Sequence, residues 1–169
     1  IHSQWEWGNG ASQPDKAYLD KFYNRTVDVI NKYDPDVVYF DDTALPFSQI
    51  SDEGLKIAAH LYNKSLRDHR NRMQAVIMGK KLTEQQKQAM LWDVERGIPD
   101  RMQELPWQTC TCLGEWHYNR DLYNRNGYKS AETVIRMLID IVSKNGNLLL
   151  SVPLRGDGSI DEKELAVLE

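Results

Sequence analysis

Long apolar runs are missing from this sequence of 169 residues. No window approaches 18 consecutive apolar residues, which excludes a membrane-spanning helix. The start of the chain lacks the basic segment and following apolar segment of a signal peptide, so the compartment has to be inferred from elsewhere. Basic residues form no long stripe that would follow phosphates, and the net charge is −4, so nucleic acid is not an expected partner.

Cysteine is scarce, with only Cys110 and Cys112, two positions apart in a predicted strand. An extended backbone holds their Cα atoms too far apart for an unstrained disulfide. No histidine lies at ligand spacing from the pair, so both are interpreted as reduced packing residues and no metal or cofactor is expected. The acids of 157–162 resemble a calcium loop, but the glycine is misplaced and no acid follows at the twelfth position, which favours a turn and a helix cap.

The composition is that of a folded domain. Hydrophobic residues make up 41% of the chain and charged residues 27%, so it can bury a core and remain soluble. No internal repeat or low-complexity linker is visible. The chain is shorter than the ~250 residues of a complete (β/α)8 barrel. It begins with Ile1 and ends inside a predicted helix, so we expect it to be a piece of a longer protein.

Five segments are predicted to be helical from apolar spacing and capping residues: 14–32, 52–69, 83–91, 130–146 and a last one that Asp161 begins. Pro14 suits a first helical position, Ser130 suits an N-cap, and Gly146 is expected to end its helix in the left-handed conformation. The second helix is expected to bury Leu55, Ala58, Ala59, Tyr62 and Leu66. The helix after Ser130 carries the apolar residues Val134, Ile135, Leu138, Ile141 and Val142.

Four short apolar runs are predicted to be strands: 35–42, 74–81, 107–116 and 147–153. A helix, or the start of one, follows each run, which predicts parallel βα units with right-handed crossovers. The last run is apolar throughout, as in strands that are covered on both faces. The stretch 92–106 is interpreted as irregular.

The first strand, "PDVVYFDD", ends in Asp41 and Asp42. Ligand sites of parallel βα folds lie at the carboxyl ends of the strands, and period-two alternation places Asp41 on the same face as Tyr39. Asp41 is therefore a candidate catalytic carboxylate. A turn cap is the alternative, because a chain with 25 acidic residues will place one at a strand end by chance.

A second carboxyl group would complete a site for glycoside hydrolysis, in which retention uses two such groups about 5.5 Å apart. Glu95 is the candidate acid, because it follows Trp92 and an aromatic wall can keep a carboxylic acid neutral by excluding water. An ion pair between Glu95 and Arg96 is the alternative.

Aromatic residues gather in the predicted loops and strand ends, where their rings could stack on a sugar, although packing is the alternative for each. They are Trp5, Trp7, Trp92, Trp107, Trp116 and Tyr118. His2 and His117 are candidates to bond sugar hydroxyls, whereas His60 and His69 lie in a predicted helix and are expected to be solvated.

Four motifs in order, "YDPDVVYFDD", "WDVERGIPD", "WQTCTCLGEWHYN" and "SKNGNLLLSVP" with "RGDGSI" after it, resemble the α-L-fucosidases of glycoside hydrolase family 29. The resemblance runs through nearly the whole chain. It implies an α/β fold with a (β/α)8-like catalytic domain, usually followed by a β-sandwich. It also implies release of L-fucose with retention through a covalent fucosyl-enzyme, without a cofactor.

The resemblance also implies roles for the two carboxylates. Asp41 matches the nucleophile, and Asp42 falls where many members have a small residue. Glu95, followed by Ile98 and Pro99, matches the acid/base. Asp93, Asp100 and Glu104 are held in reserve for that role.

For substrate binding, the resemblance points to Trp116 as a wall of the fucose pocket. Lys80 or Lys81 stands where other members commonly have an arginine that contacts the sugar, and a lysine lacks the planar fork of that arginine. Tyr39, Trp92 and His117 complete the predicted binding set.

The family's early strands and its C-terminal sandwich have no counterpart in the sequence. Residues 1–169 are therefore expected to form about half of a (β/α)8 barrel, whose two open sheet edges predict self-association or pairing with the missing half. The expected partner is a fucosylated oligosaccharide or glycoconjugate, and the resemblance favours a periplasmic or secreted location. A non-catalytic carbohydrate-binding or structural fragment is the alternative function.

Overall fold

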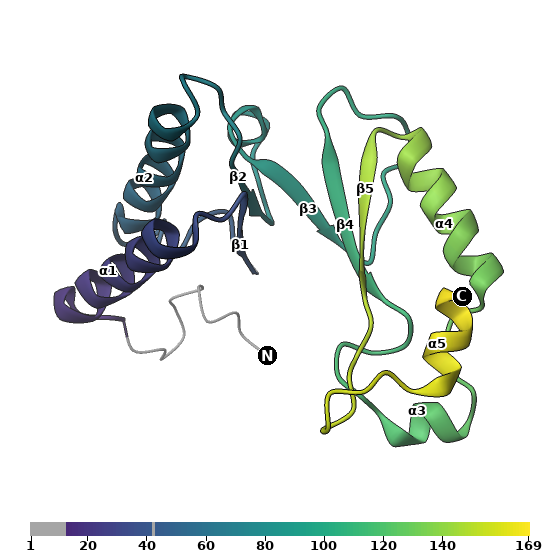
Figure 1. The fold of residues 1–169 in the computed structure, drawn as a ribbon. Coiled ribbons are helices and arrows are strands. Elements are labelled where there is room, and N and C mark those ends of the chain that lie inside the picture. The colour runs from purple at the N-terminus through teal and green to yellow at the C-terminus, as the bar shows by residue number, and fades with distance from the viewer. Residues whose placement is uncertain (1–12, 42) are drawn as a thin grey trace. The chain divides into compact units, whose positions relative to one another are not determined.

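A computed structural model describes residues 13–41 and 43–169 (Figure 1). His2, Trp5, Trp7 and Asp42 lie outside the described residues. The chain divides into two compact units, Ile1–Trp92 and Asp93–Glu169, called unit 1 and unit 2 here. Each unit is described by itself.

Unit 1 consists of βα elements in chain order. They are α1 (Lys16–Tyr33), β1 (Val37–Phe40), α2 (Glu53–Asp68), β2 (Val76–Gly79), a short 3₁₀ helix η1 (Gln86–Gln88) and the first residues of β3 (Leu91–Glu95). The strands are parallel: β1 pairs with β2, and β2 pairs with β3. This confirms the predicted parallel βα units.

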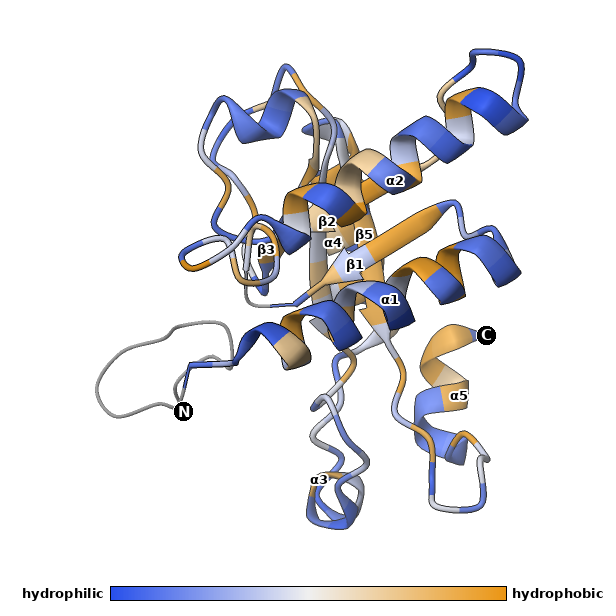
Figure 2. Cartoon of the chain, turned by 90° about the vertical axis from the view of Figure 1, so that its left-hand side faces the viewer, coloured by the Kyte–Doolittle hydropathy of each residue, from blue (hydrophilic) through white to orange (hydrophobic). Residues whose placement is uncertain are grey.

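The core of unit 1 lies between the strands and the helices α1 and α2. Its buried residues are Ile30, Phe40, Leu45, Ile57, Leu61, Ile77, Leu82 and Met90. Hydrophobic and hydrophilic residues alternate along α2, whereas β1 is hydrophobic (Figure 2). An apolar stripe on a helix and a hydrophobic strand are the two surfaces that have to be buried together.

The predicted buried face of α2 was correct in part, because Ala58 and Tyr62 pack against this core. Ile57 and Leu61 are buried, whereas Leu55 is 62% exposed and Ala59 is also exposed. A Cβ atom at Gly54 would lie 2.5 Å from the Pro46 carbonyl oxygen, so this glycine allows the preceding loop to approach the helix closely. Gly54, Ile57 and Leu61 are three and four positions apart, so they share one face of the helix. The contact at Gly54 turns this face toward the core.

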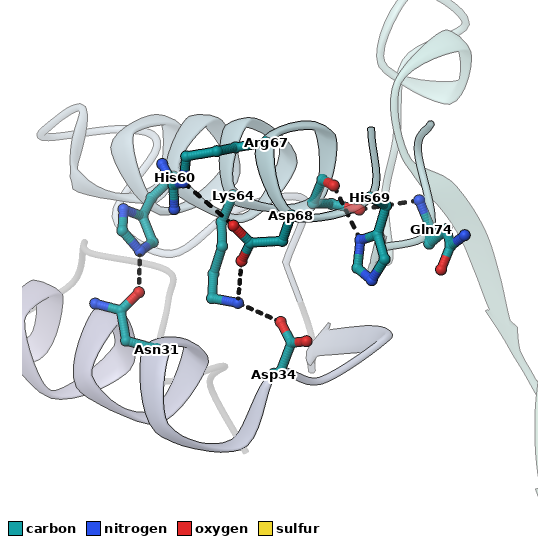
Figure 3. A network of polar contacts seen from close by, with 9 residues as sticks. Asn31, Asp34, His60, Lys64, Arg67, Asp68, His69 and Gln74 are labelled. Carbon is teal, nitrogen blue, oxygen red and sulfur yellow. Dashed lines mark hydrogen bonds and ion pairs between the residues drawn. The ribbon is translucent and has the colours of Figure 1, made fainter. Parts of the chain in front are cut away.

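A polar network joins α1 to α2 (Figure 3). Lys64 of α2 is buried and forms ion pairs with Asp34, just after α1, and with Asp68 at 2.8 Å. These two pairs raise the pKa of Lys64. His60 also bonds Asn31 at 2.8 Å, so it is not simply solvated as predicted.

Two helix predictions in unit 1 were also wrong. Helix α1 begins at Lys16, and its N-cap is Asp15, whose side chain accepts from Tyr18 N at 2.8 Å; Pro14 therefore precedes the cap. The segment 83–91 forms only η1, because the chain from Leu91 pairs with β2 as strand β3. Sheet pairing here overrides a weak helical pattern.

Unit 2 contains the end of β3 and the elements β4 (Trp107–Cys112), α3 (Arg120–Asn124), α4 (Ala131–Ser143), β5 (Gly146–Ser151) and α5 (Glu162–Leu168). The strands β4 and β5 are parallel. Arg96 N donates to Cys110 O at 2.9 Å, which ties the end of β3 to β4. The described residues thus form five strands, one more than predicted.

All six residues of β4 are buried. The last strand, β5, is not covered on both faces, so that expectation was wrong. Leu149 of β5 is 47% exposed, because α4 covers only the opposite face of this strand (Figure 1). A Cβ atom at Gly146 would lie 2.5 Å from the Trp107 ring, so glycine is needed there for close packing. The left-handed residue after α4 is Asn145, with φ 66°, and not Gly146 as predicted.

Helix α4 has the predicted Ser130 N-cap, and only one of its apolar residues named above is fully buried. Ile141 is fully buried, whereas Ile135, Leu138 and Val142 are exposed. A Cβ atom at Gly146 would lie 2.8 Å from the Ile141 side chain, so Ile141 packs against the start of β5.

The predictions for the two cysteines and for the cap of the last helix were correct. Cys110 and Cys112 are both reduced and buried, and their thiols donate to Asp93 and to Gly114 O, each at 3.1 Å. Asp161 caps α5. Within 13–41 and 43–169, no cluster of His, Cys, Asp and Glu could hold a metal ion. No helix in these ranges has the length and apolar character that crossing a membrane requires.

Candidate active site

In unit 1, Asp41 follows β1 directly and lies at the carboxyl end of the strand, where it was expected. The β1–β2 register pairs Phe40 with Gly79, so Asp41 and Lys80 are the next residues of two neighbouring strands. Lys80 Nζ donates to Asp41 Oδ1 at 2.7 Å. The Lys80 side chain is 10% exposed and that of Asp41 is 61% exposed, so a buried ammonium holds an accessible carboxylate.

The loop after β1 is fixed against the end of β2. Lys80 N donates to Thr43 O at 2.8 Å. The Thr43 hydroxyl donates to Leu45 O at 3.0 Å. A Cβ atom at Gly79 would lie 2.6 Å from Ala44 O, so only a glycine lets the loop lie this close to the strand.

Two aromatic residues of the predicted binding set also belong to unit 1. The Tyr39 ring centroid lies 6.0 Å from Lys80 Nζ, in agreement with the predicted face shared by Tyr39 and Asp41. Trp92 packs against the core of unit 1, and Lys87 Nζ lies 3.9 Å from the centroid of its ring. The structure therefore shows packing contacts for Trp92, and a role in sugar binding stays a prediction.

In unit 2, Glu95 is the last residue of β3 and is exposed. The interpretation of 92–106 as irregular was wrong for its first residues, and the correction places Glu95 at the carboxyl end of a strand. Arg96 follows in the left-handed region with φ 52°. Its guanidinium carbon lies 4.9 Å from the centroid of the Trp116 ring, within the range of a cation–π contact.

Asp93 lies two residues before Glu95 and is 1% exposed. It accepts from Gln108 Nε2 at 2.8 Å and from the Cys110 thiol at 3.1 Å. Gln108 Oε1 in turn accepts from Asn147 Nδ2 at 3.0 Å, which extends the network over β3, β4 and β5. Asp100 and Glu104, the other reserves for the acid/base, are exposed beyond the end of β3.

The loop after β4 carries Trp116 and His117, so both follow a strand at its carboxyl end. Trp116 is half-buried and His117 is exposed. Beyond this loop, Glu162 accepts from Tyr123 and, at 2.6 Å, from Arg155, and these two bonds lower the pKa of Glu162 to about 2. The pair joins the loop after β5 to α5.

The predicted site residues thus sort into two groups. Unit 1 brings together Tyr39, Asp41 and Lys80, and unit 2 brings Glu95 and Trp116 to consecutive strand ends joined by Arg96. Sequence reasoning missed the ion pair of Asp41 with Lys80 and the network around Asp93. The ion pair could have been predicted from the polar residues at the ends of two neighbouring strands. The role of Asp93 could have been predicted from its spacing of two from Glu95, which places both on one face of a strand.

Carboxylates and aromatic rings at the ends of parallel strands are typical of α/β enzymes that bind ligands in the βα loops. The sequence model of the α-L-fucosidase family matches residues 2–169, so the chain belongs to this family. No curated protein sequence matched the chain.

Solved α-L-fucosidase structures have the same fold. One gives a TM-score of 0.69 at 23% identity, over 90% of this chain and 33% of its own. Isoenzyme 1 from Paenibacillus thiaminolyticus gives a TM-score of 0.64 at 27% identity, over 94% of this chain and 39% of its own. The Thermotoga maritima enzyme gives a TM-score of 0.65 at 22% identity, over 91% of this chain and 32% of its own. The chain therefore spans about a third of the length of these relatives.

Proposed function

We propose that this chain carries the two catalytic carboxylates of a retaining exo-α-L-fucosidase of glycoside hydrolase family 29. The observation that supports this most is the accessible Asp41 carboxylate, ion-paired with Lys80 at the end of β1, in a chain of the fucosidase family. The ammonium of Lys80 lies 2.7 Å from Asp41 Oδ1 and holds this carboxylate at the strand end.

In the proposed reaction, a carboxylate oxygen of Asp41 attacks the anomeric carbon of a terminal α-L-fucoside. The bond to the leaving oxygen breaks, and Glu95 donates its proton to that oxygen. Water then attacks the anomeric carbon of the fucosyl-enzyme, gives a proton to Glu95 and releases Asp41 as a carboxylate. Among the acids on β3, Glu95 suits this exchange with substrate and water because it is exposed, whereas Asp93 is buried and hydrogen-bonded.

Trp116, Tyr39, Trp92 and His117 are proposed to line the sugar site, as the family resemblance implies. The substrate would be a fucosylated oligosaccharide or glycoconjugate. The chain would form the C-terminal half of a (β/α)8 catalytic domain, as the family resemblance implies, and it spans about a third of the solved fucosidases. The remaining strands would pair with its open edges.

The test is release of nitrophenol from a nitrophenyl α-L-fucoside by the intact protein. Turnover should disappear in Asp41→Ala and persist in Asp36→Ala, a matched control because Asp36 is an exposed carboxylate before the opposite end of β1. Equal turnover in Asp41→Ala and wild type would contradict the proposal. Fucose binding without any turnover in wild type would favour the non-catalytic, carbohydrate-binding alternative.

A further inference from the structure

We propose that Lys80 is a positioning residue that accelerates breakdown of the fucosyl-enzyme by stabilising the Asp41 carboxylate as it is released. This inference rests on the proposed function and departs from the role that the family resemblance implies for Lys80, which is contact with the sugar.

The geometry ties Lys80 to the nucleophile. Its ammonium lies 2.7 Å from Asp41 Oδ1, and its side chain is 10% exposed, so water screens the ion pair only partly. The backbone of Lys80 is fixed as well, because its N–H donates to Thr43 O and the preceding Gly79 lies tightly under Ala44. Lys80 is therefore held in place before substrate binds, as electrostatic stabilisation requires.

The charge of Asp41 changes in opposite directions in the two steps. In the first step, its oxygen forms a bond to the anomeric carbon and the carboxylate becomes a neutral ester. The negative charge of Asp41 beside Lys80 is then lost, which opposes this step. In the second step, water attacks the anomeric carbon, the ester bond breaks, and the electron pair returns to Asp41 beside Lys80.

Interactions that strengthen toward a transition state lower its barrier. Lys80 therefore raises the rate of breakdown relative to the rate of formation, and the fucosyl-enzyme does not accumulate. A lysine that only bound the sugar would change KM. It would not change the ratio of the rate constants for formation and breakdown of the fucosyl-enzyme.

The test uses the intact protein, stopped-flow detection of nitrophenol, and Lys80→Met, which keeps the chain length and removes the charge. Wild type should release nitrophenol linearly. Lys80→Met should show a burst approaching one nitrophenol per active site, followed by a steady state slower by roughly 10- to 100-fold, the range for one hydrogen bond to a charged group. Mass spectrometry of the acid-quenched variant should find fucose on the peptide that contains Asp41.

Two control variants accompany this test. Lys80→Arg keeps the charge and should remain linear. Lys56→Met removes a 51% exposed lysine from α2 and should match wild type. A linear Lys80→Met time course with a raised KM and unchanged kcat would overturn the proposal in favour of sugar binding.

Wild type provides a test that does not depend on the folding of any variant. If breakdown is fast, kcat should rise when a dinitrophenyl fucoside replaces the nitrophenyl fucoside, because forming the intermediate limits the rate. Equal kcat values for the two substrates would overturn the role of Lys80. Absence of turnover with either substrate would instead refute the proposed fucosidase function.

Discussion

The two candidate carboxylates have different surroundings. Asp41 of unit 1 is paired with a buried ammonium from the next strand, whereas Glu95 of unit 2 is exposed and the cation beside it, Arg96, lies over Trp116. A fixed ammonium suits a group that has to remain negative until it attacks. Exposure suits a group that has to lose and regain a proton in every cycle. The comparison supports different roles for the two residues in the proposed reaction.

The strongest test of this comparison replaces each carboxylate by glycine and adds azide. Asp41→Gly should lose more activity than the 10²–10⁴-fold that general acid–base catalysis contributes, and Glu95→Gly should lose activity within that range. Azide should restore product formation in both. The Asp41 variant should give the inverted fucosyl azide and the Glu95 variant the retained one, as resolved by NMR; the same anomer from both would contradict the assignment.

A second comparison concerns buried charges. Lys64 of unit 1 has two carboxylate partners, whereas the buried Glu164 of unit 2 has no hydrogen-bond partner for either carboxylate oxygen in the described part of the chain. Burial and the neighbouring Asp161 raise the pKa of Glu164 from 4.5 to about 7, against a smaller lowering by Arg155. The native state therefore holds this proton more tightly than the unfolded chain.

The sign of the pH effect follows from this difference. The contribution of Glu164 to the free energy of unfolding is complete below pH 4.5 and is lost as the pH rises toward about 7. The loss is at most about 3 kcal/mol, because a tenfold difference in proton affinity corresponds to about 1.36 kcal/mol. Urea denaturation across this range should show a weaker decline for Glu164→Gln than for wild type; parallel curves would contradict the prediction.

A third test compares two tightly packed glycines, Gly79 of unit 1 and Gly146 of unit 2. Gly79→Ala and Gly146→Ala should each lower the free energy of unfolding by about 1–3 kcal/mol through overpacking. Only Gly79→Ala should also lower kcat, because the loop it displaces follows Asp41. Gly156→Ala is the control, since its added Cβ meets nothing within 4 Å. Equal kcat values for the Gly79 and Gly146 variants would show that the loop position is unimportant.

The smallest effect is expected at Arg96. Asn tolerates the left-handed backbone, so Arg96→Asn removes the contact with Trp116 without straining the turn. KM for the nitrophenyl fucoside should rise about two- to fivefold, since an exposed cation–π contact is worth about 0.5–1 kcal/mol. Arg70→Asn, at another left-handed and exposed position, should leave KM unchanged. A KM shift in both variants would indicate a general charge effect.

Local features of the fold could be predicted from the sequence, and features that depend on distant partners could not. Asp41 was placed correctly because an apolar run and its polar end are adjacent in the chain. Strand β3 was missed because its central residue, Asp93, is polar, and its burial depends on Gln108 and Cys110 from another strand.

The helix faces show the same limit. Spacing identifies the apolar side of α2 and α4, but it does not say which part of that side is covered. In α2 the close contact at Gly54 decides this, and in α4 the contact of Ile141 with Gly146 does so. Similarly, the ion pair of Asp41 with Lys80 follows from the register of β1 and β2, which is fixed only when the strands pair.

The two thiols of the chain have a practical consequence. Cys110 and Cys112 are both buried in β4, and the sequence of unit 1 contains no cysteine. A thiol-reactive dye can modify the native protein only while unit 2 is transiently open. The rate at which these two thiols are labelled therefore reports the opening of unit 2.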